Sequence, residues 1–208
     1  RQIGITELSN EIDRLQKLEN LRLQKNKLTE LPDQICNLSR LEFLYLSNNK
    51  IEVLPDDFGR LHRLIVLDAD VNNIRNLPAS IGGLSSIRTL NFGHNKIEAI
   101  PNGVYELNTL LNLNLEDNQV SEVSDKIGQL TKLKSLSLAG NNLTEIPEEL
   151  TELKNLELLI LSQNQLAKMP RKLRRLKSLK TLILIDNQFS EKEIKRIKRK
   201  LKDVDVRV

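Results

Sequence analysis

Few side chains in this 208-residue sequence have the types and spacing that acid–base, nucleophilic or metal chemistry requires. His94 and Asp117 form the one pair that could exchange a proton, and a polar surface contact is the simpler interpretation of that pair. The lone cysteine, Cys36, supplies neither a zinc ligand set nor an intramolecular disulfide. No Gly-rich phosphate loop and no nucleophile elbow occurs. The sequence therefore predicts no catalytic residue, no metal site and no cofactor.

Positive charge is concentrated at the C-terminal end. Residues 168–208 contain 15 Lys and Arg against 5 Asp and Glu, a net charge of +10, whereas the whole chain carries +4. Such a surface can hold an anionic membrane, an anionic polymer or an acidic protein, although a solvated face of a terminal helix also explains it. No aromatic residues are interleaved for base stacking, so nucleic acid is not a predicted partner. The candidate anion-binding residues are Arg171, Lys172, Arg174, Arg175, Lys195, Arg196 and Arg199.

A sequence repeat of constant period must position these side chains. Its first apolar position recurs at Leu18, Leu41, Leu64, Ile87, Leu110, Leu133, Leu156 and Leu179, and an asparagine stands at the same later position of each copy, from Asn26 to Asn187. The L-x-L alternation in each copy predicts a short strand, and later apolar residues at i, i+4 and i+7 predict a short helical or 3₁₀ turn. Strands joined by crossovers in one direction must stack in parallel, which predicts a curved right-handed coil. We expect the asparagines to satisfy backbone groups where the chain leaves each strand.

The copies divide the chain into three parts: a partial N-terminal repeat over 1–17, eight repeats over 18–189, and a C-terminal cap over 190–208. Ser190 and Glu193 predict a capping box at the start of a cap helix, and alternating valines predict a closing edge strand after it. The N-terminus has no comparable cap, so we expect either that upstream residues are missing or that the first turn is frayed. Four departures from the template are interpreted as packing adjustments: Ala69, Phe92, Ser124 and Phe189. The alternative for Ala69 is a local dent beneath a binding surface.

The template L-x-x-L-x-L-x-x-N-x-L-x-x-L-P-x-x-I-x-x-L resembles the leucine-rich repeat proteins of the 23-residue class. That class includes Erbin, Scribble and the Ras-pathway scaffold repeats, and the tail that begins at Asn187 is similar to bacterial members such as those of Leptospira. The resemblance implies an α/β solenoid with a parallel sheet on its concave face and short 3₁₀ or helical turns on its convex face. It also implies scaffolding or host interaction. Likeness to the bacterial members favours a secreted or cell-surface protein, and a cytoplasmic scaffold is the alternative.

The residues that alternate with the buried leucines predict a binding surface, here called the concave face: the third, fifth, seventh and eighth positions of each copy. Exposed apolar and aromatic groups on such a face indicate a protein interface. The candidates are an N-terminal apolar patch (Phe43, Tyr45, Val66), a polar centre (Asp68, Asp70, Asn91, Asn114, Glu116, Asp117) and a C-terminal apolar patch (Leu158, Ile160, Ile183, Ile185).

The sequence thus predicts a non-enzymatic module that binds a protein partner on its concave face. A second copy of the chain could also cover the apolar patches, and the C-terminal patch could instead pack against the cap. The alternative function is surface attachment or self-assembly, in which the basic C-terminal end contacts an anionic membrane or polymer.

Overall fold

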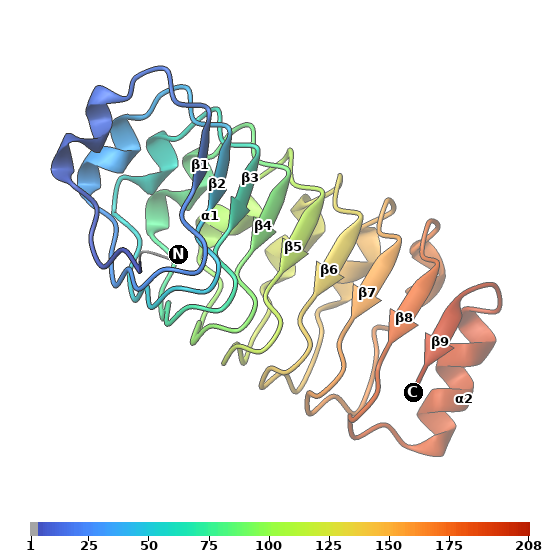
Figure 1. Ribbon diagram of the computed structural model, residues 1–208. Helices are drawn as coiled ribbons and strands as arrows, with labels where there is room; N and C mark the ends of the chain where they lie inside the picture. Colours follow the sequence, from blue (N-terminus) through green and yellow to red (C-terminus); the bar gives the residue numbers. More distant parts are fainter. Residues whose placement is uncertain (1–3) are drawn as a thin grey trace.

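The computed structural model describes residues 4–208, so the first three residues of the predicted partial repeat lie outside the described residues. Within 4–208, nine short strands form a single parallel sheet in chain order, and each strand pairs in register with the next strand along the chain (Figure 1). The predicted solenoid is confirmed. The strands are β1 (Asn20–Arg22), β2 (Phe43–Tyr45), β3 (Val66–Asp68), β4 (Thr89–Asn91), β5 (Asn112–Asn114), β6 (Ser135–Ser137), β7 (Leu158–Ile160), β8 (Thr181–Ile183) and β9 (Asp205–Arg207).

A short helical turn lies opposite each of the first eight strands, on the other side of the coil (Figure 1). Four of these eight turns have a proline at the N-cap, where its missing N–H costs no helical hydrogen bond; Pro32 and Pro78 are examples. The turns are η1 (Asn10–Arg14), η2 (Asp33–Asn37), η3 (Phe58–Arg60), η4 (Ala79–Gly83), α1 (Asn102–Tyr105), η5 (Asp125–Gln129), η6 (Glu148–Glu152) and η7 (Leu173–Arg175).

The core between the sheet and the turns is aliphatic, and an asparagine ladder runs along it. Asn95 is typical: its Oδ1 accepts from the Ile74 N–H at 3.0 Å, and its Nδ2 donates to the Ala69 carbonyl at 3.0 Å. Asn72, Asn118, Asn141 and Asn164 repeat this pattern, and each is buried. The ladder therefore satisfies backbone groups of neighbouring copies, as the repeat predicted.

The departures from the template have local physical reasons. Ala69 and Phe92 occupy the same inward position in successive copies, and both are fully buried. The large Phe92 side chain therefore lies next to the small Ala69 side chain, which offsets part of the core volume that alanine leaves unfilled. Ser124 stands where other copies carry proline; its N–H donates to the hydroxyl of buried Tyr105 at 3.2 Å, and its own hydroxyl caps η5. Proline could make neither of these two bonds.

The two ends of the coil differ. At the C-terminus, α2 (Glu191–Lys200) covers the last leucine layer with Ile197, and β9 extends the sheet (Figure 1). Ser190 caps α2 by accepting from the Glu193 N–H, but the Glu193 side chain does not complete the capping box; it binds Arg196 and the Met169 N–H instead. At the other end, the Ile5 backbone ties the described part of the first turn to the next copy: its N–H donates to Asn26 Oδ1, and its carbonyl accepts from the Lys27 N–H.

Candidate functional site

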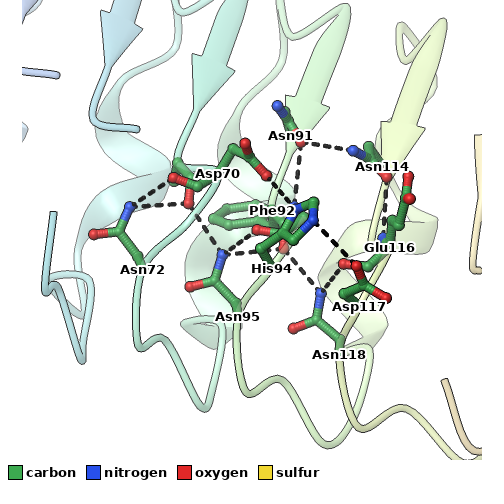
Figure 2. Close-up of polar contacts among 12 residues, drawn as sticks. Asp70, Asn72, Asn91, Phe92, His94, Asn95, Asn114, Glu116, Asp117 and Asn118 are labelled. Atoms are coloured by element: carbon green, nitrogen blue, oxygen red, sulfur yellow. Dashed lines mark hydrogen bonds and ion pairs between the residues drawn. The ribbon is translucent and has the colours of Figure 1, made fainter. Parts of the chain in front are cut away.

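A histidine held between two aspartates lies at the centre of the concave face. His94 Nδ1 is 3.0 Å from Asp70 Oδ1, and its Nε2 is 3.1 Å from Asp117 Oδ2 (Figure 2). The three side chains come from consecutive copies, and half of the His94 side chain is exposed. The sequence suggested the pairing with Asp117, whereas the contact with Asp70 was not predicted.

The backbone explains how His94 reaches both neighbours. It occupies the eighth position of its copy, where the chain turns out of the strand with a positive φ, here 51°. Six other non-glycine residues and Gly140 have the same conformation at that position. A Cβ on Gly140 would overlap the Asp117 carboxylate, and a Cβ on Gly93 would lie only 2.7 Å from Asp70 Oδ1. The two glycines leave the space in which the aspartates hold His94.

Asp70 raises the pKa of His94 through its hydrogen bond to the ring, and the charges of Asp70, Asp117 and Glu116 add to this effect. Partial burial of the ring opposes the shift. When His94 is protonated, it neutralises part of the negative charge at the centre of the concave face. Acid therefore makes this surface less negative.

A second polar network runs beside the histidine. Asn91 Nδ2 donates to Asp68 Oδ1 at 2.9 Å. Asn114 Nδ2 donates to Asn91 Oδ1, also at 2.9 Å (Figure 2). Asn114 Oδ1 also accepts from the Glu116 N–H at 3.0 Å. The structure thus brings the six predicted residues of the polar centre together on β3, β4 and β5 and the segments that follow β3 and β5.

Val71 borders this centre and is not among the predicted binding residues. Val71 has φ 54° and is 39% exposed, and a β-branched residue is strained in that region of backbone space. Its position in the repeat could have identified it. Val71 is the eighth residue of its copy, and the eighth residues of the preceding and following copies are Asn48 and His94. An exposed and strained apolar residue is typical of a functional surface.

The two apolar patches lie on either side of the polar centre and do not meet. Phe43, Tyr45 and Val66 are half-buried on β2 and β3, and the Arg22 guanidinium lies 5.2 Å from the centre of the Tyr45 ring. The patch on β7 and β8 continues to Ile185, which is 42% exposed. Between the polar centre and this second patch, β6 presents only the small side chains of Ser135 and Ser137 to the concave face. The hydroxyl of Ser137 is buried and has no hydrogen-bond partner among the described residues.

The predicted anion-binding residues fall into two groups. Three of them have carboxylate partners: Arg175 with Glu152, Lys195 with Glu191, and Arg196 with Glu193. Arg196 also donates to the Met169 carbonyl at 2.6 Å and is only 24% exposed, so it fastens α2 to the preceding loop. The remaining four, Arg171, Lys172, Arg174 and Arg199, are exposed without an ion pair within residues 4–208.

The other chemically notable groups contribute no reactive centre. Cys36 is buried and unpaired, and burial, together with Asp33 and Asp57, raises the pKa of its thiol to about 11. His62 lies away from His94, with its Nδ1 2.9 Å from the Gly83 carbonyl. Over residues 4–208, no group of three or more His, Cys, Asp or Glu side chains is arranged to hold a metal ion. In the same part of the chain, no helix has the length and apolar character needed to span a bilayer.

Three profiles of one repeat family match the sequence: "Leucine-rich repeat region" over 33–119, "Leucine rich repeat" over 131–189 and "Leucine Rich Repeat" over 17–38. No curated protein matches it significantly.

Solved structures also resemble the chain. A Leptospira interrogans leucine-rich repeat protein, LIC12759, superposes with a TM-score of 0.97 at 34% identity; the match covers 100% of this chain and 53% of that one, so this chain spans about half of its relative's length. The plant peptide hormone receptor RGFR1, solved in complex with RGF2, gives a TM-score of 0.81 at 28% identity over 88% of this chain and 30% of its own. A Listeria monocytogenes internalin, at 19% identity, has a TM-score of 0.80 over 96% of this chain and 63% of its own, and shows the shared fold. The repeats, their register and these matches together establish that the chain belongs to the leucine-rich repeat proteins.

Proposed function

We propose that this protein binds a protein partner on its concave face and has no catalytic activity. The observation that carries the proposal is the ordered polar centre around His94, Asp70 and Asp117, with apolar side chains on both sides of it. Leucine-rich repeat domains are in general protein-binding modules, and the related plant receptor is known in complex with RGF2. In this protein the role would be host interaction or scaffolding.

The arrangement of the concave face fits recognition of a folded loop or an extended segment. The apolar patches supply contacts that release water, whereas the central carboxylates orient a cationic or hydrogen-bonding group of the partner. Asp68, Asn91 and Asn114 already hold one another by hydrogen bonds, so their side chains lose little further conformational freedom on binding. This preorganisation favours affinity.

The site geometry also supports the non-enzymatic part of the proposal. Both ring nitrogens of His94 are engaged by carboxylates, and the concave residues beside it are Asn, Asp, Glu, Gly and Val, without a hydroxyl, thiol or amine among them. A general base needs a free nitrogen within reach of a proton on the reacting group. His94 is therefore better placed to organise the surface than to transfer a proton.

Two substitutions on the concave face test the proposal. Tyr45→Lys and Ile160→Lys each place a charge in one apolar patch, and Val53→Lys is the matched control because Val53 is 58% exposed and lies outside the concave face. Wild type and variants, matched by circular dichroism, would be immobilised and exposed to extracts, and bound proteins would be identified by mass spectrometry.

We expect one specific protein to be retained by wild type and by Val53→Lys and to be lost from both concave variants. Retention of that protein by Tyr45→Lys and Ile160→Lys would refute the concave-face proposal. Light scattering on the same samples tests the self-association alternative: a dimer that only the concave variants disrupt would make a second copy of this chain the partner.

A further inference from the structure

A shallow groove lies between η7 and the C-terminal end of α2, which packs against η7. Cationic side chains dominate its lining, and Asp203 is the one acidic residue among them. All of the cations are exposed except Lys200, which is half-buried. They are Arg174, Lys177, Arg199, Lys200 and Lys202.

These five cations, here called the groove cations, line one groove and have no acidic partner within residues 4–208, a property that they share with Arg171 and Lys172 outside the groove. Arg175, Lys195 and Arg196 are each paired with a glutamate, as described above. None of the groove cations makes an ion pair with any residue in 4–208. Like charges gathered around one groove repel one another, and a bound anion would relieve that repulsion.

The helix macrodipole accounts for only part of this charge. Arg199 and Lys200 lie in the last turn of α2, where cations interact favourably with the helix terminus. Arg174 and Lys177 belong to η7 and to the segment that follows it, so the dipole of α2 gives no reason for their presence. Two separate segments thus supply positive charge to one groove.

We propose that the groove binds a linear anionic polysaccharide that carries sulfate groups. Arginine forks and lysine ammonium groups both suit sulfate oxygens, and arginine can bind two of them at once. This site is separate from the concave face, and it does not depend on the protein partner proposed above.

Other anions fit the lining less well. Base stacking requires aromatic side chains, and none lines the groove. Insertion into an anionic bilayer requires exposed apolar groups, whereas the strongly exposed aliphatic side chains of residues 4–208 lie elsewhere, at Ile5, Leu15, Val53, Val71, Ile185 and Val208. An acidic peptide would seek apolar anchor sites, but Leu176, Leu179 and Leu201 on the groove floor are no more than 6% exposed.

Matched pairs of substitutions separate the groove from the general basic charge. The groove variant is Arg174→Gln with Lys177→Gln. The control is Lys192→Gln with Lys198→Gln, which removes the same charge from exposed positions of α2 that do not line the groove. Thermal unfolding curves would first establish that wild type and both variants are equally folded. Binding of a fluorescent heparin octasaccharide would then be measured by anisotropy at several salt concentrations.

We expect wild type to bind the octasaccharide with an affinity that falls steeply with salt. The groove variant lacks two cationic contacts, each worth about fivefold in affinity, so it should bind roughly 25-fold more weakly. The control should stay within about twofold of wild type. Equal losses in both variants, or no binding by wild type at low salt, would overturn the proposal. Tighter groove-dependent binding to phosphatidylserine vesicles, or to a single-stranded oligonucleotide of equal charge, would also overturn it, in favour of a membrane or a nucleic acid respectively.

Discussion

Replacing one asparagine of the ladder, Asn95→Ala, should destabilise the protein strongly. The substitution removes the Oδ1 that accepts from the Ile74 N–H, and that buried N–H has no other partner among the described residues. An orphaned buried donor costs about 1–3 kcal/mol. The three carbonyls that Asn95 serves each keep another donor: Asn72 for Ala69, Asn118 for Phe92 and the Val71 N–H for Gly93. Their weakened bonding adds roughly 1 kcal/mol, so we expect about 2–4 kcal/mol in all.

The position of the asparagine in the coil provides the control. Asn26 makes the same kinds of bond, to the Ile5 N–H and the Leu23 carbonyl, but it is only half-buried, so water can replace them. We expect Asn26→Ala to cost about 0.5–1 kcal/mol, and substitution of the exposed Asn108 to cost less than about 0.5 kcal/mol. Urea unfolding followed by circular dichroism, with the slope compared among variants, measures all three. If Asn95→Ala costs no more than Asn26→Ala, the ladder is not satisfying buried backbone groups as described.

Four further predictions concern the concave face and the core beneath it. Because the hydrogen bond that the His94 ring donates to Asp70 is the main cause of the raised pKa of His94, Asp70→Asn should lower the His94 pKa measured by NMR more than Asp117→Asn does. A reversed order would contradict the geometry. The raised pKa means that the ion pairs of His94 stabilise the fold fully below the unfolded-state pKa and lose that effect as pH rises through the folded-state pKa. His94→Gln should therefore cost about 0.2–1 kcal/mol near about pH 5.5, and this cost should decrease as the pH is raised through the folded-state pKa, as followed by urea unfolding. Val71→Asn relieves a strained φ of 54° with a residue that tolerates it, so the unfolding free energy should rise by about 1 kcal/mol, and a loss of stability would show that Val71 is not strained. Ala69→Leu overfills the layer next to Phe92 and should cost about 1–3 kcal/mol, part of which Phe92→Leu should recover; purely additive losses in the double variant would mean that the two side chains do not share space.

The local pattern of the sequence was sufficient to predict the strands, the turns and the cap helix. Burial of Leu44, Leu67 and Leu90 follows from the constant period of the repeat, because each copy must turn its L-x-L motif toward the same core. The role of the asparagines was equally predictable, since a buried amide at a chain bend has backbone groups to satisfy. The repeat also predicted which residues share the concave face, because the residues that alternate with the buried leucines must point away from the core.

The partners of individual polar side chains were decided by the tertiary structure. Asp70 and His94 occupy different positions in their copies, and they meet because a positive φ at His94 redirects its ring across the neighbouring turn. The Glu193 side chain does not form the predicted capping box; it binds Arg196 and the Met169 N–H instead. Arg196 therefore holds the cap helix in place and is not a free surface cation. A repeat specifies which residues are buried through a short-range period. The partner of a charged side chain depends instead on distances of a few ångströms between groups in different copies, and only the folded coil sets those distances.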